Sequence, residues 1–313
     1  MTTKIPMLSL ISLADDHRAW IEAEYDFTYA PDAARRREAV AALGADCRAV
    51  LTNGATGLTA EEIAALPKLE LICTLGAGYE NVALDAARAR GIVVATGAGT
   101  NEDCVADHAL GLLIAAVRGI VRLDAQCRAG VWRDHIPLPP QLSGRRLGIL
   151  GLGAIGRKIA RRAAAFDLEI GYHNRRPVAD VGYRHFEDLA ALAAWADFLV
   201  VATPGGAGTK HLVDAAVIEA LGAQGVLVNI ARGSVVDTAA LADALRAGRL
   251  AGAGLDVYEG EPRPPEALLD LDNVILTPHV AGWSPEAMAA SVRRVLANAD
   301  GHFDGRGAVS VVG

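Results

Sequence analysis

The sequence predicts an α/β protein built from two doubly wound parallel-sheet domains. Residues 1–99 and 146–282 each alternate short apolar segments with segments of helical composition, a rhythm typical of parallel sheets covered by helices on both faces. The chain of 313 residues is also too long for one ordinary hydrophobic core. A Gly-x-Gly-x-x-Gly turn occurs only in the second stretch, so we expect the two domains to bind different molecules.

The composition is that of a folded, water-soluble protein, with 52% hydrophobic and 21% charged residues. A net charge of −7 argues against a nucleic-acid partner. No apolar run approaches the roughly 20 residues that span a bilayer, and Met1–Pro6 does not resemble a signal peptide. The four cysteines are scattered without metal-ligand spacing, so we expect reduced, mostly buried thiols, no metal site and a cytoplasmic location.

The first domain is expected to carry five strands, at Met7–Ser12, Asp26–Tyr29, Ala49–Thr52, Leu69–Thr74 and Ile92–Ala95. Helices are expected at Asp15–Glu22, at Asp32–Leu43, after a capping box at Thr59-x-x-Glu62, and at Leu84–Arg90. The fourth strand runs into the Gly-rich loop Leu75-Gly76-Ala77-Gly78. Because no dinucleotide motif is present, this domain is expected to bind something other than a dinucleotide.

A long helical region, Asn101–Gly130, follows and is expected to break near Gly119. Its apolar surface exceeds what one domain needs to bury, so we expect it to serve a dimer interface as well. The next segment, Val131–Ser143, is rich in proline and irregular.

The second domain is expected to contain six strands, at Leu147–Leu150, Leu168–Tyr172, Phe198–Ala202, Val226–Asn229, Gly252–Leu255 and Val274–Leu276. A last helix at Pro285–Ala299 is long enough to return to the first domain. The predicted division is therefore residues 1–99 with 284–313, and residues 100–283, with a helical dimerisation region at about 101–143.

The clearest motif is Gly151-Leu152-Gly153-Ala154-Ile155-Gly156, which lies between a predicted strand and a predicted helix. Gly151 permits the tight turn, Gly153 lets the backbone approach a pyrophosphate, and Gly156 lets helix and strand pack closely. The helix N-terminus offers N–H groups to the phosphates. A dinucleotide site is favoured over a purely structural turn.

The next strand ends at Asn174-Arg175-Arg176, where an NAD site usually carries an Asp or Glu for the ribose hydroxyls. Asparagine and two guanidinium groups can instead donate to a 2′-phosphate, so NADP is preferred over NAD. The alternative is a solvated basic turn. Thr203 and Pro204, at the end of the third strand, are expected to flank the dinucleotide, although an ordinary turn would look the same.

Three candidates for chemistry follow later strands: Arg232, Glu261 and His279. Singly, such an arginine is often a surface residue and such a histidine is often structural. Together they indicate a common site, because the strands of a doubly wound sheet end along one crevice, where all three side chains can meet.

The chemistry of the three residues suits a 2-oxo acid, which presents a carboxylate beside a ketone. Arg232 can bind the carboxylate and polarise the ketone oxygen. His279 can act as the general acid when hydride reaches the carbon, since its reference pKa lies near neutrality. Glu261 can hold the other ring nitrogen and favour the imidazolium.

The glycine turn, Asn229-x-Ala231-Arg232-Gly233, Asp256-Val257-Tyr258-Glu259-x-Glu261-Pro262 and Thr277-Pro278-His279 together resemble the D-isomer-specific 2-hydroxyacid dehydrogenase family over essentially the whole chain. The resemblance implies a Rossmann cofactor domain inserted into a flavodoxin-like substrate domain, and a homodimer. It implies Arg232, Glu261 (not Glu259) and His279 as catalytic residues. Backbone N–H groups of Leu75, Gly76, Ala77 and Gly78 would bind the substrate carboxylate. Ile230, Ala231 and Asp256 would line the cofactor, with Asp256 at the nicotinamide carboxamide.

Within that family, Asn174-Arg175-Arg176 is similar to the NADPH-preferring glyoxylate/hydroxypyruvate reductases. The main hypothesis is therefore NADPH-dependent reduction of a small 2-oxo acid, with reduction of bulkier acids such as hydroxyphenylpyruvate as the alternative. A remote alternative is a non-catalytic, NAD(P)-sensing corepressor-like protein. Three large residues, Trp132, His135 and Trp283, could shape the substrate pocket or pack at an interface.

Overall fold

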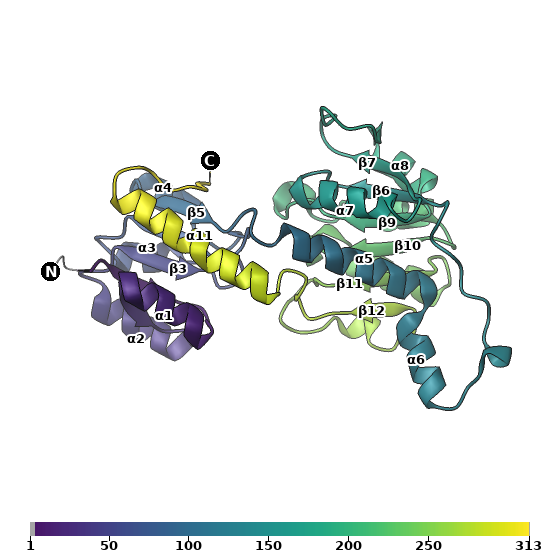
Figure 1. The fold of residues 1–313 in the computed structure, drawn as a ribbon, viewed down its shortest axis with the longest axis horizontal. Helices are drawn as coiled ribbons and strands as arrows, with labels where there is room; N and C mark the ends of the chain where they lie inside the picture. Colours follow the sequence, from purple (N-terminus) through teal and green to yellow (C-terminus); the bar gives the residue numbers. More distant parts are fainter. Residues whose placement is uncertain (1–3, 313) are drawn as a thin grey trace. The chain divides into compact units, whose positions relative to one another are not determined.

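A computed structural model describes residues 4–312, and these fall into two compact units (Figure 1). Of the described residues, unit 1 comprises 4–101 and 283–312. Unit 2 is Glu102–Gly282. Each unit is a parallel sheet with helices on both faces, so the predicted α/β class is confirmed.

Unit 1 contains a five-stranded sheet in the order β2-β1-β3-β4-β5, with every neighbouring pair parallel. This is the flavodoxin-like strand order. All five strands lie where the sequence predicts them: β1 (Pro6–Ser9), β2 (Asp26–Tyr29), β3 (Ala49–Thr52), β4 (Leu71–Thr74) and β5 (Val93–Thr96).

The helices of unit 1 cover both faces of this sheet, because successive strand residues point to opposite sides. Leu8, Val50 and Ile72 pack against one group of helices, α2 (Ala33–Leu43), α3 (Ala60–Ala65) and α4 (Leu84–Ala89). Met7, Leu51 and Leu71 pack against the other, α1 (Asp15–Glu24) and α11 (Pro285–Phe303). The predicted capping box is present, since Thr59 and Glu62 each accept the other's backbone N–H.

Unit 2 contains a seven-stranded parallel sheet in the order β12-β11-β10-β9-β6-β7-β8. The prediction of six strands was wrong by one, because the short edge strand β8 (Arg184–Phe186) was missed. The others are β6 (Arg146–Leu150), β7 (Glu169–His173), β9 (Phe198–Val201), β10 (Val226–Asn229), β11 (Gly252–Leu255) and β12 (Val274–Leu276). This is the Rossmann order with one added strand, and its topological switch point lies between β6 and β9.

Helices again cover both faces. One face carries α5 (Glu102–Arg118) and α7 (Ala154–Ala164), and the other carries α8 (Leu189–Trp195), α9 (Ala215–Leu221) and α10 (Thr238–Arg246). Short 3₁₀ turns occur at η1 (Arg133–His135), η2 (Ala207–Thr209), η3 (Gly233–Val235) and η4 (Glu266–Leu268).

The long helical region is broken where the sequence predicts. Gly119 adopts a left-handed φ of 63° and separates α5 from α6 (Ile120–Arg128). Within residues 4–312, no single helix is long and apolar enough to cross a bilayer; α5 and α6 pass that test only as a pair bent by 58°. Burial of the thiols holds for Cys47 and Cys73 but not for Cys127, which is exposed.

Candidate active site

The glycine turn between β6 and α7 has a separate reason for each glycine. Gly151 has a φ of +99°, and a Cβ there would lie 2.8 Å from the backbone of Thr203 on the neighbouring strand end. A Cβ on Gly156 would lie 2.1 Å from the Gly151 carbonyl oxygen. A Cβ on Gly153 would meet nothing within 4 Å, so packing within the protein does not require this glycine. Gly153 therefore leaves space above the N-terminus of α7, which begins at Ala154.

Asn174 joins the end of β7 to this turn. Its side-chain oxygen accepts the Leu152 N–H at 2.7 Å, so its amide N–H₂ remains the group that can face a ligand. Arg175 and Arg176 are exposed, and neither pairs with a carboxylate in the described part of the chain. The turn can thus offer donors to an anion and has no carboxylate to repel it.

Three neighbouring strands of unit 2 end in the same row, because Asn229, Leu255 and Leu276 are partners in the β10–β11–β12 register. Arg232 follows the first strand, Glu261 the second and His279 the third. The row is at the carboxyl edge of the sheet, where ligands of this fold bind.

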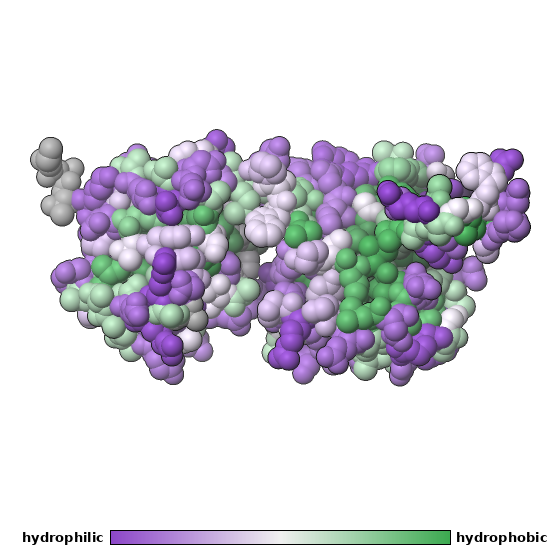
Figure 2. Space-filling view, turned by 90° about the horizontal axis from the view of Figure 1, so that it is seen from below, coloured by the Kyte–Doolittle hydropathy of each residue, from purple (hydrophilic) through white to green (hydrophobic). Residues whose placement is uncertain are grey.

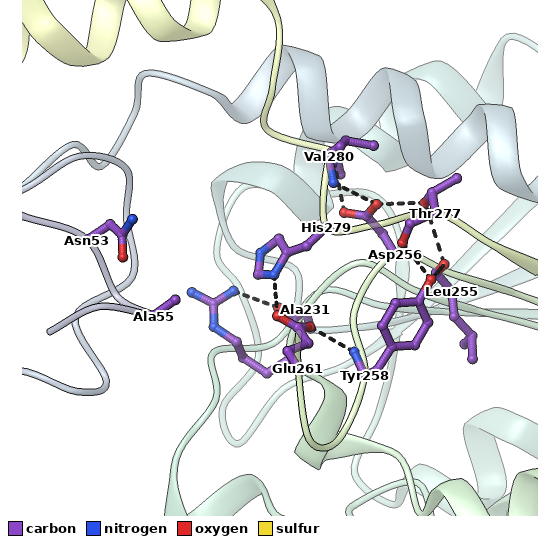
Figure 3. Close-up of polar contacts among 12 residues, drawn as sticks. Asn53, Ala55, Ala231, Leu255, Asp256, Tyr258, Glu261, Thr277, His279 and Val280 are labelled. Carbon is purple, nitrogen blue, oxygen red and sulfur yellow. Dashed lines mark hydrogen bonds and ion pairs between the residues drawn. The ribbon is translucent and has the colours of Figure 1, made fainter. Parts of the chain in front are cut away.

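Glu261 and His279 form an ion pair at this edge (Figure 3). His279 Nδ1 lies 2.7 Å from Glu261 Oε2, and Glu261 Oε1 accepts the Tyr258 N–H at 2.8 Å. With Nδ1 bound in this way, Nε2 is the ring nitrogen that can serve a substrate. The His279 side chain is 45% exposed, so its ring can reach a ligand.

The ionisation of both groups is shifted by this contact. The hydrogen bond to Glu261 is the largest influence on the pKa of His279 and raises it, while burial and the charge of Arg232 act against the rise. Burial alone would raise the pKa of Glu261, but the hydrogen bonds from His279 and Tyr258 outweigh it and lower that pKa. The pair therefore favours imidazolium beside carboxylate, which is the form that a general acid requires.

Arg232 is held at the start of η3, where its Nη1 donates to the Ala231 carbonyl at 2.6 Å. Its charge influences the pKa values of both Glu261 and His279, so the three residues lie within electrostatic range of one another. The strand end before it, Ile230-Ala231, is buried. A guanidinium beside an imidazolium can bind a carboxylate and a carbonyl oxygen together.

Asp256 is buried, with 1% of its surface exposed, and both carboxylate oxygens are engaged. Oδ1 accepts from Thr277 Oγ1 at 2.6 Å and from Val280 N at 2.9 Å (Figure 3). Oδ2 accepts from Ala281 N at 2.9 Å. Asp256 thus organises the loop that carries His279. An expected contact with a nicotinamide carboxamide would have to use the remaining capacity of Oδ2.

Tyr258 supports the same loop, although the sequence did not single it out. Its hydroxyl donates to the Thr277 carbonyl at 2.5 Å. Burial, reinforced by the charges of Asp256 and Glu261, raises the pKa of Tyr258 to about 12, so the phenol stays protonated.

The other carboxylate of the motif, Glu259, binds a different histidine. Its Oε1 lies 2.8 Å from His211 Nε2, and its Oε2 accepts the Thr238 N–H at 3.2 Å. Two glutamates that are two residues apart therefore hold two separate imidazoles.

The loop Leu75–Gly78 belongs to unit 1. Leu75 N–H already donates to the Thr52 carbonyl at 2.8 Å, so it is not available to a substrate. The N–H groups of Gly76, Ala77 and Gly78 have no acceptor within residues 4–312, and Ala77 is exposed. Consecutive backbone N–H groups of this kind can bind a small anion.

The three large residues are all open to solvent in their own units. Trp132 is 66% and Trp283 69% exposed, and His135 lies in the exposed turn η1. No set of three His, Cys, Asp or Glu side chains that could hold a metal ion occurs in the described part of the chain.

Comparisons with known proteins agree on one family. The family model described as "D-isomer specific 2-hydroxyacid dehydrogenase, NAD binding domain" matches residues 110–281. Hydroxyphenylpyruvate reductase of Plectranthus scutellarioides is 41% identical over 272 residues, which cover 87% of each chain. Glyoxylate/hydroxypyruvate reductase A HPR2 of Arabidopsis thaliana is 41% identical over 266 residues, which cover 85% of each chain.

Solved structures are similar over the whole chain. The NADPH-dependent glyoxylate/hydroxypyruvate reductase of Sinorhizobium meliloti, in complex with NADP and malonate, has a TM-score of 0.91 at 37% identity. The match covers 99% of this chain and 97% of that one. The 2-hydroxyacid dehydrogenase of Ketogulonicigenium vulgare Y25 also has a TM-score of 0.91 at 37% identity, covering 100% and 99% of the two chains.

Proposed function

The chain belongs to the D-isomer-specific 2-hydroxyacid dehydrogenase family, and we propose that it reduces a small 2-oxo acid, glyoxylate or hydroxypyruvate, to the D-2-hydroxy acid with NADPH. Relatives are named as reductases of glyoxylate, hydroxypyruvate, hydroxyphenylpyruvate and 2-ketogluconate. The observation that carries the proposal is the 2.7 Å contact between His279 Nδ1 and Glu261 Oε2 at the carboxyl edge of the sheet.

In this proposal, Arg232 binds the substrate carboxylate and draws electron density toward the ketone oxygen. Bound NADPH would supply the hydride that the ketone carbon receives. His279 Nε2 gives its proton to the ketone oxygen as negative charge develops there. Glu261 holds Nδ1, so the ring keeps its orientation and its charge is stabilised before the proton leaves.

The glycine turn fits a dinucleotide. The space above Gly153 is the part of the turn that a Cβ would fill, and the N-cap of α7 has no side-chain hydrogen bond. A pyrophosphate would therefore meet uncapped N–H groups at a helix N-terminus. Thr203 and Pro204 lie across the switch point from this turn and would flank the dinucleotide.

The preference for NADP rests on Asn174, Arg175 and Arg176. The engaged oxygen of Asn174 leaves only donors toward the ligand, and the two guanidinium groups are exposed. Donors suit a 2′-phosphate, whereas NAD is usually bound by an acidic residue at this place. A relative at 37% identity was solved with NADP.

In the proposed division of labour, unit 2 binds the cofactor and unit 1 supplies substrate contacts. Gly76, Ala77 and Gly78 would bind the substrate carboxylate through their N–H groups. Leu75 is left out of this role, because Thr52 already takes its N–H.

We also propose a homodimer formed through the region of about 101–143. Helix α6 has no buried residue, and Ile120, Val121, Trp132 and Leu138 are exposed. Figure 2 shows a broad hydrophobic area on the surface of unit 2. Contiguous apolar surface of this kind is typical of interfaces. Sedimentation equilibrium would test the proposal, and a monomer at micromolar concentration would contradict it.

A second substrate class has one specific observation in its favour. The hydroxyphenylpyruvate reductase is as similar to this chain as the Arabidopsis relative, at 41% identity each. Steady-state rates with NADPH on glyoxylate, hydroxypyruvate and hydroxyphenylpyruvate would decide between them. A higher kcat/KM for the aromatic acid would overturn our choice of substrate.

The general-acid role has its own test. His279→Ala should lower kcat by roughly 10²–10⁴-fold, the usual contribution of a positioned acid, while NADPH binding measured by fluorescence is retained. His302→Ala removes a histidine from unit 1 and should leave kcat unchanged. Unaltered turnover in His279→Ala would refute the assignment.

A further inference from the structure

The loop that carries His279 has an unfavourable backbone conformation that its surroundings must maintain. His279 has a φ of +54°, in the left-handed region that side-chain-bearing residues rarely adopt. Such a residue persists only where neighbouring contacts over-determine it. Two of these contacts come from the Asp256 carboxylate, which accepts the N–H groups of Val280 and Ala281, both at 2.9 Å. The Tyr258 hydroxyl, which donates to the Thr277 carbonyl, and Cys104 Sγ, which donates to the Ala281 carbonyl, add to them.

The same carboxylate is linked to helix α5 through a hydroxyl. Thr277 Oγ1 lies 2.6 Å from Asp256 Oδ1 and 2.9 Å from His108 Nε2. His108 Nε2 is also 3.5 Å from Asp256 Oδ1. His108, Thr277 and Asp256 therefore form one chain that runs from α5 to the His279 loop.

The proton positions in this chain follow from the donor inventory. An ionised carboxylate can only accept, so the hydroxyl proton of Thr277 points to Asp256. Thr277 Oγ1 can then only accept from the imidazole, and His108 Nε2 must carry a proton. That N–H is directed at the hydroxyl and, at a longer distance, at the carboxylate, so it stabilises a charge that is buried to 99%.

We propose that His108 is a positioning residue for His279, acting through Thr277 and Asp256. Within residues 4–312, no hydrogen bond or ion pair joins His108 to Glu261 or His279. Its contribution is to keep the Thr277 hydroxyl directed at Asp256, and thereby to keep the Asp256 oxygens in place to accept the N–H groups of Val280 and Ala281, which follow His279 in the loop. The inference rests on the proposed reduction, because it assigns His108 a part in holding the proton donor.

The strained loop explains why a distant donor matters to the ion pair. His279 Nδ1 meets Glu261 only while residue 279 stays in its left-handed conformation. If the Asp256 carboxylate turns, the backbone can relax and the 2.7 Å contact lengthens. The charge on Asp256 also favours the imidazolium of His279.

The test uses the full chain and five variants. His108→Ala removes the donor, and His108→Gln retains an N–H at a similar reach. Thr277→Val removes the hydroxyl at nearly constant volume, and His108→Ala/Thr277→Val combines both changes. Asp107→Asn is the control, since Asp107 is the neighbouring residue on α5 and pairs with Arg162.

We expect kcat with NADPH and the preferred 2-oxo acid to fall about tenfold in His108→Ala, or about 1.4 kcal/mol. The KM for the acid should change less than about twofold, since Arg232 and unit 1 are untouched. Thr277→Val should lower kcat by a similar factor, and the double variant should have a kcat no lower than that of either single variant. His108→Gln should restore most of the kcat that His108→Ala loses. Additive losses, or no recovery in His108→Gln, would overturn the proposal.

A second measurement does not depend on turnover. In NMR titrations without substrate, with the His279 resonance assigned by its absence in His279→Asn, the pKa of His279 should fall in His108→Ala and Thr277→Val. It should stay raised in His108→Gln and Asp107→Asn. An unchanged His279 titration in His108→Ala overturns the inference even if no 2-oxo acid is reduced. Loss of all turnover in the unmodified chain would contradict only the proposed function.

Discussion

The side chain of Arg232 lies directly against Gly205: a Cβ added to Gly205 would come within 2.6 Å of Arg232 Cγ. Gly205 belongs to the loop after β9, and Arg232 follows β10, the next strand in the sheet. Because residue 205 has no side chain, the aliphatic part of the Arg232 side chain can pack directly against this loop.

Gly205→Ala should displace Arg232 and weaken substrate binding. We expect the KM for the 2-oxo acid to rise by roughly five- to tenfold, which corresponds to about 1–1.4 kcal/mol. Gly208→Ala is the matched control, because a Cβ there would meet nothing within 4 Å. Steady-state kinetics on both variants check this, and equal KM values in both would contradict it.

Glu261→Gln should make the rate of reduction fall at a lower pH than in the unmodified chain. The hydrogen bond from Glu261 is the main cause of the raised pKa of His279, so its loss lowers that pKa. A general acid must be protonated, and the alkaline limb of the kcat profile should therefore move to lower pH, with kcat at neutral pH reduced about tenfold or more. Glu259→Gln, which faces His211 instead, should leave this limb in place.

Two glycines of one motif should respond differently to alanine. In Gly156→Ala, the Cβ would lie 2.1 Å from the Gly151 carbonyl oxygen, so strand and helix must separate and the protein should lose stability. In Gly153→Ala, the Cβ meets open space, and only NADPH binding should suffer, by about tenfold or more. Thermal unfolding and NADPH titration distinguish the two, and a stable, tightly binding Gly153→Ala would argue against a pyrophosphate at this turn.

Arg175→Ala and Arg176→Ala should discriminate between the two cofactors. Each guanidinium that bonds a 2′-phosphate should contribute about 1.5–3 kcal/mol, so we expect the KM for NADPH to rise more than tenfold in at least one variant. The KM for NADH should change little, because it lacks that phosphate. The control is Arg246→Ala, which removes an arginine of α10 that pairs with Asp270. Equal effects on NADPH and NADH would contradict NADP preference.

The Glu259–His211 pair should contribute to stability with a defined pH dependence. Burial tends to raise the pKa of Glu259, but the hydrogen bonds from His211 and Thr238 lower it overall. A lowered folded-state pKa means that the stabilisation is present above the ordinary pKa of about 4.3 and is lost as pH falls through the folded value. At pH 7, Glu259→Gln should lower Tm by roughly 1–4 °C.

The same comparison in acid provides the check. Differential scanning calorimetry at pH 7 and at pH 3 should show the Tm difference between Glu259→Gln and the unmodified chain shrinking as Glu259 becomes protonated. A difference that grows toward low pH would show that the carboxylate destabilises the fold.

The sequence predicted eleven of the twelve strands found in residues 4–312, because most of them are continuous apolar runs buried on both faces. It missed β8, whose three residues are Arg184, His185 and Phe186. This strand pairs only with β7 at the edge of the sheet, so it needs no apolar run. Its contribution is nevertheless specific, since His185 Nε2 contacts the Asn174 carbonyl at 3.1 Å.

The convergence of Arg232, Glu261 and His279 could be predicted because parallel strands end at a common edge. The family resemblance distinguished Glu261 from Glu259, but the contact of Glu259 with His211 could not be predicted. It depends on how the chain turns at Gly260, whose φ is +81°. Nor could the sequence show that Leu75 N–H is occupied or that His108 reaches Thr277. These facts follow from packing between segments that are far apart in the chain.

The discontinuity of unit 1 has a consequence for the order in which the protein matures on the ribosome. Met7, Leu71 and Cys73 share one core with Val292 and Val295 of α11. The first five strands are therefore synthesised well before the helix that covers part of their sheet. At about 5–20 residues per second, unit 2 emerges during an interval on the order of ten seconds or more. Throughout that interval the face of the unit 1 sheet that α11 covers remains incomplete. Unit 2 is therefore the first of the two units that can fold completely.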